Sequence, residues 1–150
     1  MTTRTGERIA AAFERAPALV ERLERLGTVG STDGAIAAAR EALADMSESQ
    51  RIAVLDAHPR IGADPASLSP ASRREQGGDD DPMMLEELAR LNDEYERRHG
   101  FRFVVFVDGR PKRALLPVLR ERLERPREAE LLTGLEEFLA IARERLERSS

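Results

Sequence analysis

Two short segments contain the side chains best suited to chemistry in this sequence. His58 precedes Pro59, and the residue before a proline is disfavoured in the helical region, so the imidazole is predicted to lie at a helix end. Ser72, Glu75 and Gln76 follow at spacings of three and four residues, which place them on one face of a helix. Imidazole titrates near neutral pH, as a general acid–base catalyst should. The combination predicts acid–base chemistry that needs neither a metal nor a cofactor.

Each segment alone has a plainer interpretation. A histidine at a helix end commonly caps a carbonyl, and a polar helix face is commonly just solvated. The occurrence of both segments in one chain favours catalysis by His58. The second histidine, His99, is predicted at another helix end beside Arg97 and Arg98, and we expect it to be exposed.

Other kinds of catalytic site are disfavoured by what the sequence lacks. Cysteine is absent and the two histidines are 41 positions apart, so we expect no metal site. The acidic run 79–81 lacks the spaced ligands and the final glutamate of a calcium loop. No glycine-rich phosphate loop or Gly-x-Ser-x-Gly motif occurs, and Lys112 is predicted to lie in a turn. We therefore expect no bound cofactor.

Length and composition predict one domain over residues 1–150. The net charge is −4 and aromatic residues make up 4% of the chain, whereas a nucleic-acid binder usually has a basic stripe. Residues 1–13 contain no apolar segment long enough for a signal peptide or a membrane span, and the absence of cysteine fits a reducing compartment. We expect a cytoplasmic protein that binds a small molecule and neither nucleic acid nor membrane.

Apolar periodicity and capping residues predict helices through most of the chain. Thr32 or Asp33 is expected to cap one helix, and Ser47 with Gln50 forms a capping box for the next, which must end near His58. The expected helices cover 8–26 (interrupted at Pro17), 34–46, 48–57, 70–76, 82–99, 111–123 and 126–146.

Residues 101–107 are the exception to the helical pattern. Their phenylalanines and valines are typical of a β-strand, but no other segment offers a partner strand. We expect a buried, partly extended segment that leads into a turn at Asp108 and Gly109. The predicted fold class is all-α: a single-domain multi-helix bundle with one buried extended or irregular segment near 101–107.

Several motifs in order along the chain resemble the OHCU decarboxylase family, where OHCU is 2-oxo-4-hydroxy-4-carboxy-5-ureidoimidazoline. They are Ala57-His58-Pro59, Leu68-Ser69, Ser72-x-x-Glu75-Gln76, Leu91-Asn92-x-x-Tyr95, Gly100-Phe101-x-Phe103 and Ile141-Ala142-x-x-Arg145-Leu146. The resemblance runs from about residue 9 to residue 146. It implies an all-helical fold of the family type, cofactor-free decarboxylation of the last intermediate between urate and (S)-allantoin, and a possible homodimer.

The resemblance also assigns roles to residues. It implies that His58 is the catalytic imidazole and that Glu75 holds the ureido and ring N–H groups. It implies substrate contacts from Arg145 and from a further set: Pro59, Ser72, Gln76, and the main chain around Phe101, Phe103, Val104 and Val105. Helical periodicity alone does not choose between Arg143 and Arg145, and only the resemblance favours Arg145.

The sequence departs from the family pattern at four places, one of which is a missing Arg-Pro-Phe stretch, and alternatives therefore stay open. Arg60-Ile61-Gly62 follows the His-Pro pair in place of the more usual Asp-Leu-Ala, residues 77–82 are polar, and a tryptophan near the N-terminus is missing. One alternative is an enzyme of the same family that acts on a related ureido or imidazolone acid. The others are a non-catalytic all-helical ligand-binding module and a helical structural protein without a pocket.

Overall fold

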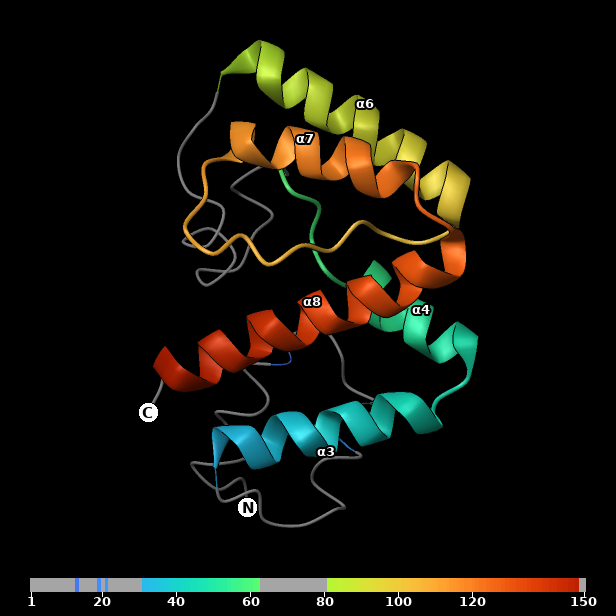
Figure 1. Cartoon of the computed structure of the whole chain (residues 1–150), viewed down its shortest axis with the longest axis vertical. Coiled ribbons are helices and arrows are strands. Elements are labelled where there is room, and N and C mark those ends of the chain that lie inside the picture. The colour runs from blue at the N-terminus through green and yellow to red at the C-terminus, as the bar shows by residue number, and fades with distance from the viewer. Residues whose placement is uncertain (1–12, 14–18, 20, 22–30, 63–80, 149–150) are drawn as a thin grey trace.

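The computed structural model describes residues 13, 19, 21, 31–62 and 81–148. Within these residues the chain forms helices and no strand, as the all-α prediction requires. The helices are α3 (Thr32–Asp45), α4 (Glu48–Asp56), α6 (Pro82–His99), α7 (Lys112–Leu123) and α8 (Arg127–Arg148) (Figure 1). None of them is long and apolar enough to cross a membrane.

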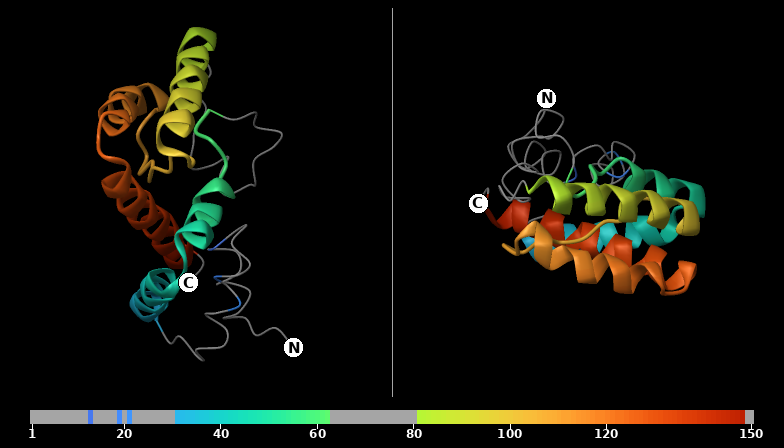
Figure 2. Two further views of the ribbon diagram at one scale, coloured as in Figure 1. Left: turned by 90° about the vertical axis from the view of Figure 1, so that its right-hand side faces the viewer. Right: turned by 90° about the horizontal axis from the view of Figure 1, so that it is seen from above.

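Helix α8 is the centre of the fold. It packs against α3 and α4 on one side and against α6 on the other, and α6 packs against α7. Figure 2 shows α6 and α7 side by side when the molecule is seen from above. The buried side chains form one core, whose largest members include Phe13, Tyr95, Phe103 and Phe138. Apolar burial of this kind is the main favourable term in folding.

The helix ends follow the predicted capping signals closely. Both bonds of the capping box are present, because Gln50 N–H donates to Ser47 Oγ at 3.2 Å and Ser47 N–H donates to Gln50 Oε1 at 2.9 Å. The cap of α3 is Ser31, whose Oγ accepts from the backbone N–H of Gly34 at 3.0 Å, and not Thr32 or Asp33. Thr32 and Asp33 instead begin the helix, because the Ser31 side chain already accepts a hydrogen bond from a backbone N–H of the first turn.

Helix α6 has the predicted start and stop. Asp81 Oδ1 accepts from the backbone N–H of Met83 at 3.1 Å, and Pro82 occupies the first helical position, where a missing N–H costs nothing. Gly100 ends the helix with φ +82°, a left-handed conformation that glycine adopts without strain. The helices expected over 8–26 and 70–76 lie largely or wholly outside the described residues.

Residues 101–107 are extended and buried, as predicted. They have no strand partner in the described structure and cross between α7 and α8 (Figure 1). Polar side chains take the place of a neighbouring strand: Arg122 Nη1 donates to the carbonyl of Val104 at 2.6 Å, and Phe106 N–H donates to Glu137 Oε1 at 3.4 Å. Main-chain groups buried away from water need such partners.

The expectation that His99 is exposed is wrong. Its side chain is 2% exposed, and its ring lies 4.5 Å from that of Tyr95 and 5.9 Å from that of Phe101, centroid to centroid. The last turn of α6 is covered by the start of α8, where Arg127 Nε donates to the His99 carbonyl at 2.8 Å. Lys112 is also buried, and it begins α7 rather than lying in a turn.

Candidate active site

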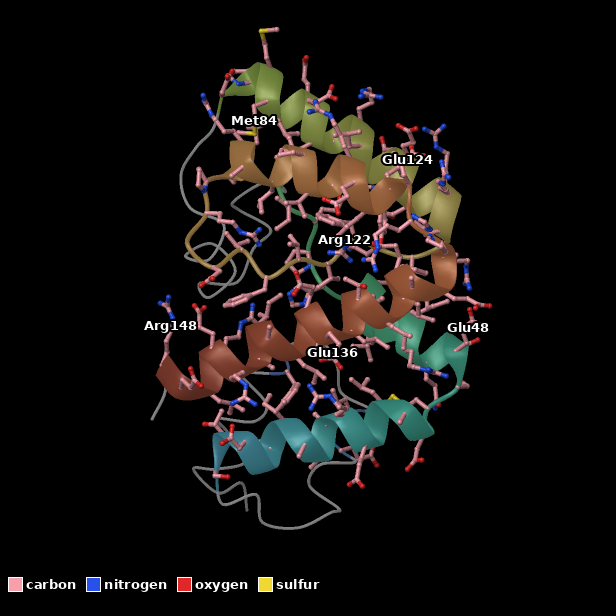
Figure 3. All side chains as sticks on the ribbon, in the orientation of Figure 1. Glu48, Met84, Arg122, Glu124, Glu136 and Arg148 are labelled. Carbon is pink, nitrogen blue, oxygen red and sulfur yellow. The ribbon has the colours of Figure 1, made fainter. Side chains whose placement is uncertain are left out.

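A pocket opens between the turn after α4, the extended segment and the C-terminal half of α8. It is lined by His58, Pro59, Ile61, residues 103–109, Ile141, Glu144 and Arg148. The predicted site residues His58, Pro59, Phe103, Val104 and Val105 therefore meet at one place, although they come from segments more than forty positions apart. Figure 3 shows Arg148 at the C-terminal end of α8.

His58 follows α4 directly and is nearly buried. Its side chain is 9% exposed, and its ring meets the ring of Phe138 edge-on, with centroids 5.9 Å apart. Its backbone N–H donates to the carbonyl of Leu55 at 3.0 Å, which continues the last turn of the helix. Pro59 cannot extend that helix, so the imidazole is held where the chain turns away. An imidazole placed in this way can donate or accept a proton within the pocket.

The extended segment forms the opposite wall of the pocket. Its carbonyls are held by guanidinium groups, since Arg122 binds Val104 and Arg110 binds Phe106 and Val107. The guanidinium carbon of Arg122 also lies 4.6 Å from the centroid of the Phe103 ring. These bonds fix the main chain of the wall, as a site that binds a ligand through backbone groups needs.

The described lining of the pocket carries several ionisable groups. His58, Asp108, Glu144 and Arg148 all border it, and Arg148 Nη2 pairs with Glu144 Oε1 at 2.8 Å. Asp108 has φ +51°, in the αL region that aspartate tolerates better than most residues. Among the described residues, no three His, Asp or Glu side chains gather as metal ligands would.

The structure separates the two arginines that periodicity left equivalent. Arg143 Nη1 pairs with Asp33 Oδ1 on α3 at 2.5 Å, and its side chain is 40% exposed. Arg145 is 8% exposed and lies four residues after Ile141, which borders the pocket. A spacing of four residues puts Ile141 and Arg145 on the same face of α8. Arg145 itself is not among the residues that line the pocket.

The remaining predicted site residues lie elsewhere. Phe101 does not border the pocket but packs in the aromatic cluster behind it, with Tyr95 and His99. Ser72, Glu75 and Gln76 lie outside the described residues.

Sequence reasoning missed other residues that line the pocket. On α8 these are Glu144 and Arg148, which follow Ile141 by three and seven residues, so helical spacing could have found them. Ile61 and residues 106–109 also belong to the lining. They could have been predicted from their closeness in sequence to the predicted site residues Pro59 and Val105.

Within the described residues, an all-helical fold places a nearly buried imidazole against an extended main-chain wall. A sequence model of the OHCU decarboxylase family matches residues 2–147. The 2-oxo-4-hydroxy-4-carboxy-5-ureidoimidazoline decarboxylase of Haloferax volcanii is 29% identical over 138 residues, which cover 89% of this chain and 82% of that protein. The chain belongs to the OHCU decarboxylase family.

Two solved structures share the fold. The crystal structure of (S)-allantoin synthase matches with a TM-score of 0.71 and 25% identity, covering 96% of this chain and 49% of that chain. The crystal structure of OHCU decarboxylase in the presence of (S)-allantoin matches with a TM-score of 0.73 and 24% identity, covering 93% of this chain and 94% of that chain. These matches confirm the predicted all-α fold of the OHCU decarboxylase type.

Proposed function

We propose that this chain decarboxylates 2-oxo-4-hydroxy-4-carboxy-5-ureidoimidazoline to (S)-allantoin in urate degradation, with His58 as the acid–base group. The observation that carries the proposal is the position of His58, which shares one pocket with Pro59 and residues 103–105. Membership of the OHCU decarboxylase family supports the same reaction.

The reaction explains how so few groups can suffice. When the bond between the ring carbon and the carboxylate breaks, CO₂ leaves and its electron pair passes into the conjugated imidazolone ring. The substrate thus supplies the electron sink that many decarboxylases obtain from a cofactor. A protonated His58 stabilises the developing negative charge and then donates a proton to one face of the neighbouring ring carbon, which bears the ureido group, while the hydroxyl on the decarboxylated carbon gives up its proton to become a carbonyl. Protonation from one face yields one enantiomer of allantoin.

The other groups hold the substrate in place. Glu75 accepts N–H bonds from the ureido group and the ring, and Arg145 binds the substrate from α8. Ser72 and Gln76 make further polar contacts with the substrate. The N–H groups of the extended wall bind the polar edge of the ring. Orientation of this kind can supply a large part of a rate enhancement. A single domain over residues 1–150, a cytoplasmic location and a homodimer belong to the same proposal.

Circular dichroism of the product tests the proposed reaction. Urate is converted with uricase and hydroxyisourate hydrolase, and this protein is then added. Unaided decay of the substrate gives racemic allantoin, which has no optical signal, so we expect a rapid (S)-allantoin signal only with active enzyme. His58→Gln should lower kcat by about 10²–10⁴-fold, the usual share of general acid–base catalysis. No acceleration by the wild type would contradict the proposal and favour a related ureido acid.

A pair of variants on α8 tests the substrate role of Arg145. Arg145→Gln should lower kcat/KM by about 10- to 100-fold, the loss expected for one hydrogen bond to a charged group. Arg143→Gln is the matched control, because Arg143 pairs with Asp33 on α3 instead. Equal losses in both variants would count against a contact between Arg145 and the substrate. A ligand-binding module without turnover would bind the substrate equally well with and without the imidazole of His58.

A further inference from the structure

We propose that Arg60, Glu96 and Arg102 form an ionic clamp that positions His58 against the extended wall of the pocket. The three residues act through His58 and its neighbours rather than on the substrate, so they are positioning residues. The proposal rests on the catalytic role of His58 proposed above.

Arg102 binds the end of the helix that carries His58. Its Nη1 donates to the carbonyl of His58 at 2.8 Å and to the carbonyl of Asp56 at 3.0 Å. The backbone N–H of Arg102 donates in turn to Asp56 Oδ1 at 2.9 Å. The last carbonyls of a helix have no partner within the helix, so this one guanidinium satisfies two groups that would otherwise need water.

The position of Arg102 in the chain gives these bonds a second consequence. It immediately precedes Phe103, the first residue of the extended segment that lines the pocket. A bond from Arg102 to the His58 carbonyl therefore joins the two walls of the pocket directly. The separation between the imidazole and the main chain of residues 103–107 is then fixed by a planar, rigid group.

Arg60 and Glu96 hold the turn from its other end. Arg60 Nε donates to Glu96 Oε2 at 2.7 Å, and its Nη2 pairs with Asp93 Oδ1 at 2.9 Å. The hydrogen bond that Arg60 donates to Glu96 raises the pKa of Arg60, so the guanidinium stays charged. Arg102 Nε lies 3.6 Å from the same Glu96 oxygen, which makes that carboxylate common to both arginines.

The clamp therefore grips the chain on both sides of the imidazole. Arg102 binds the carbonyl of His58, Arg60 ties the chain two residues later to Glu96 on α6, and Glu96 also pairs with Arg102. Asn92, one helical turn earlier on α6, adds a bond from Nδ2 to the carbonyl of Ile61 at 3.2 Å. The Arg60, Glu96 and Arg102 side chains are about a quarter to a third exposed, so salt screens these bonds less than fully exposed pairs.

Kinetics of Arg102 variants test the clamp. Arg102→Met keeps an unbranched apolar stem but removes every side-chain donor, and we expect kcat to fall by about 10- to 100-fold, as misplacement of a catalytic group by about 1 Å can cause. KM should change by less than about threefold, because the Arg102 side chain binds the carbonyls of Asp56 and His58 and not the substrate. Arg102→Lys retains a cation and donors and should recover most of the lost kcat.

Arg90→Met is the matched control. Arg90 lies on α6 as Glu96 does and has comparable ion pairs, with Glu87 at 2.6 Å and Glu94 at 3.5 Å, but it does not touch the turn. It should leave both kcat and KM unchanged. Glu96→Gln should lower kcat in the same direction as Arg102→Met and provides a second variant if Arg102→Met does not fold. Unchanged kcat in folded Arg102→Met and Glu96→Gln, or an equal loss in Arg90→Met, would overturn the proposal.

A measurement without substrate separates this proposal from the proposed reaction. Each of the two histidines gives one imidazole ¹³Cε1 signal by NMR, and His58→Gln assigns them. Arg102→Met should shift the His58 signal, because that ring moves relative to Phe138, whereas the His99 signal should stay in place. If the wild type fails to decarboxylate while this shift occurs, the reaction is wrong and the clamp stands. An unmoved His58 signal would overturn the clamp, whatever the activity.

Discussion

Glu130 shows how much one buried residue can hold together. Its carboxylate has no exposed surface, and it accepts bonds from Tyr95 Oη at 2.6 Å, Arg122 Nε at 2.7 Å and Arg125 Nη1 at 2.9 Å. Arg122 also binds the carbonyl of Val104, so the network reaches the wall of the pocket. Burial raises the pKa of Tyr95 well above its usual range, and the phenol remains a neutral donor. A buried carboxylate is tolerated only with partners of this kind.

Tyr95→Phe should measure the value of one of these bonds. The variant keeps the ring contacts with His99 and Phe103 but removes the hydroxyl that donates to Glu130. The free energy of unfolding should fall by about 1.5–3 kcal/mol, as for other hydrogen bonds to charged groups. Urea denaturation checks this as a lower midpoint with an unchanged m value. A midpoint equal to that of the wild type would mean that the two arginines alone satisfy the carboxylate.

At the scale of single residues, the sequence predicted the residues of the pocket better than it predicted the buried polar residues. The position before Pro59 singled out His58, and the family resemblance added Pro59 and residues 103–105. The structure brings these residues to one pocket, and their roles stay predictions. His99 was misjudged from its basic neighbours, although Leu88, Tyr95 and His99 share a helical face that is buried throughout. Arg122 and Glu130 lie on different helices, so helical spacing does not predict the bond between them. Such pairs depend on how the elements pack.

At the scale of elements, α4 and α8 approach closely at Gly134. A Cβ built on Gly134 would lie 3.2 Å from Leu55 Cδ1, and Leu55 has no exposed surface. Leu55 also accepts the backbone N–H of His58, so the contact sets the position of the helix end that carries the imidazole. Glycine is unfavourable inside helices, and its presence here allows the two backbones to approach.

Gly134→Val should therefore destabilise the protein despite a better helix former at that position. Overpacking typically costs about 1–3 kcal/mol, which outweighs the smaller gain in helix propensity. The displaced α4 should also lower kcat, because His58 follows Leu55 by one helical turn. Thermal unfolding and the allantoin assay check both effects. Gly134→Ala should fall between the valine variant and the wild type in kcat. A valine variant as stable and active as the wild type would show that Leu55 has room to move.

The helices were easier to predict than the segment between α6 and α7. Each of the five described helices begins and ends within a few residues of its prediction, because caps and prolines are local signals. Residues 101–107 have the composition of a strand, and only the lack of a partner indicated otherwise. Several of their hydrogen bonds come from arginines on α7 and in the following turn, which sequence alone does not locate.

At the scale of the whole molecule, ion pairs join α8 to the α3 layer across the surface. Arg40 binds Glu136 through two hydrogen bonds, at 3.1 Å and 2.9 Å, and Arg143 pairs with Asp33. Each pair joins residues about a hundred positions apart, one on α3 and one on α8, and these two helices also pack against each other. Exposed pairs contribute little individually, so the apolar contact must provide most of the stability of this layer.

The stabilisation that the Arg40–Glu136 ion pair provides depends on pH. The hydrogen bond from Arg40, and then its charge, lower the pKa of Glu136 in the folded protein. A lowered folded-state pKa means that the stabilisation is complete above the pKa of an unfolded glutamate, about 4.3. It is lost as the pH falls through the folded-state value, because protonation then removes the negative charge.

Arg40→Gln should therefore lower the free energy of unfolding at pH 7 by at most about 1 kcal/mol, after allowance for the exposure of both side chains. The difference from the wild type should shrink as the pH falls below about 4.3, the pKa of a glutamate in the unfolded chain. It should disappear once Glu136 is protonated in the folded protein, because the ion pair is then lost. It should also shrink in about 1 M salt, where the screening length is about 3 Å. Urea unfolding of both proteins across this pH range checks the prediction. A difference that persists at low pH and high salt would show that Arg40 stabilises the α3–α8 layer by packing of its aliphatic stem, rather than by charge.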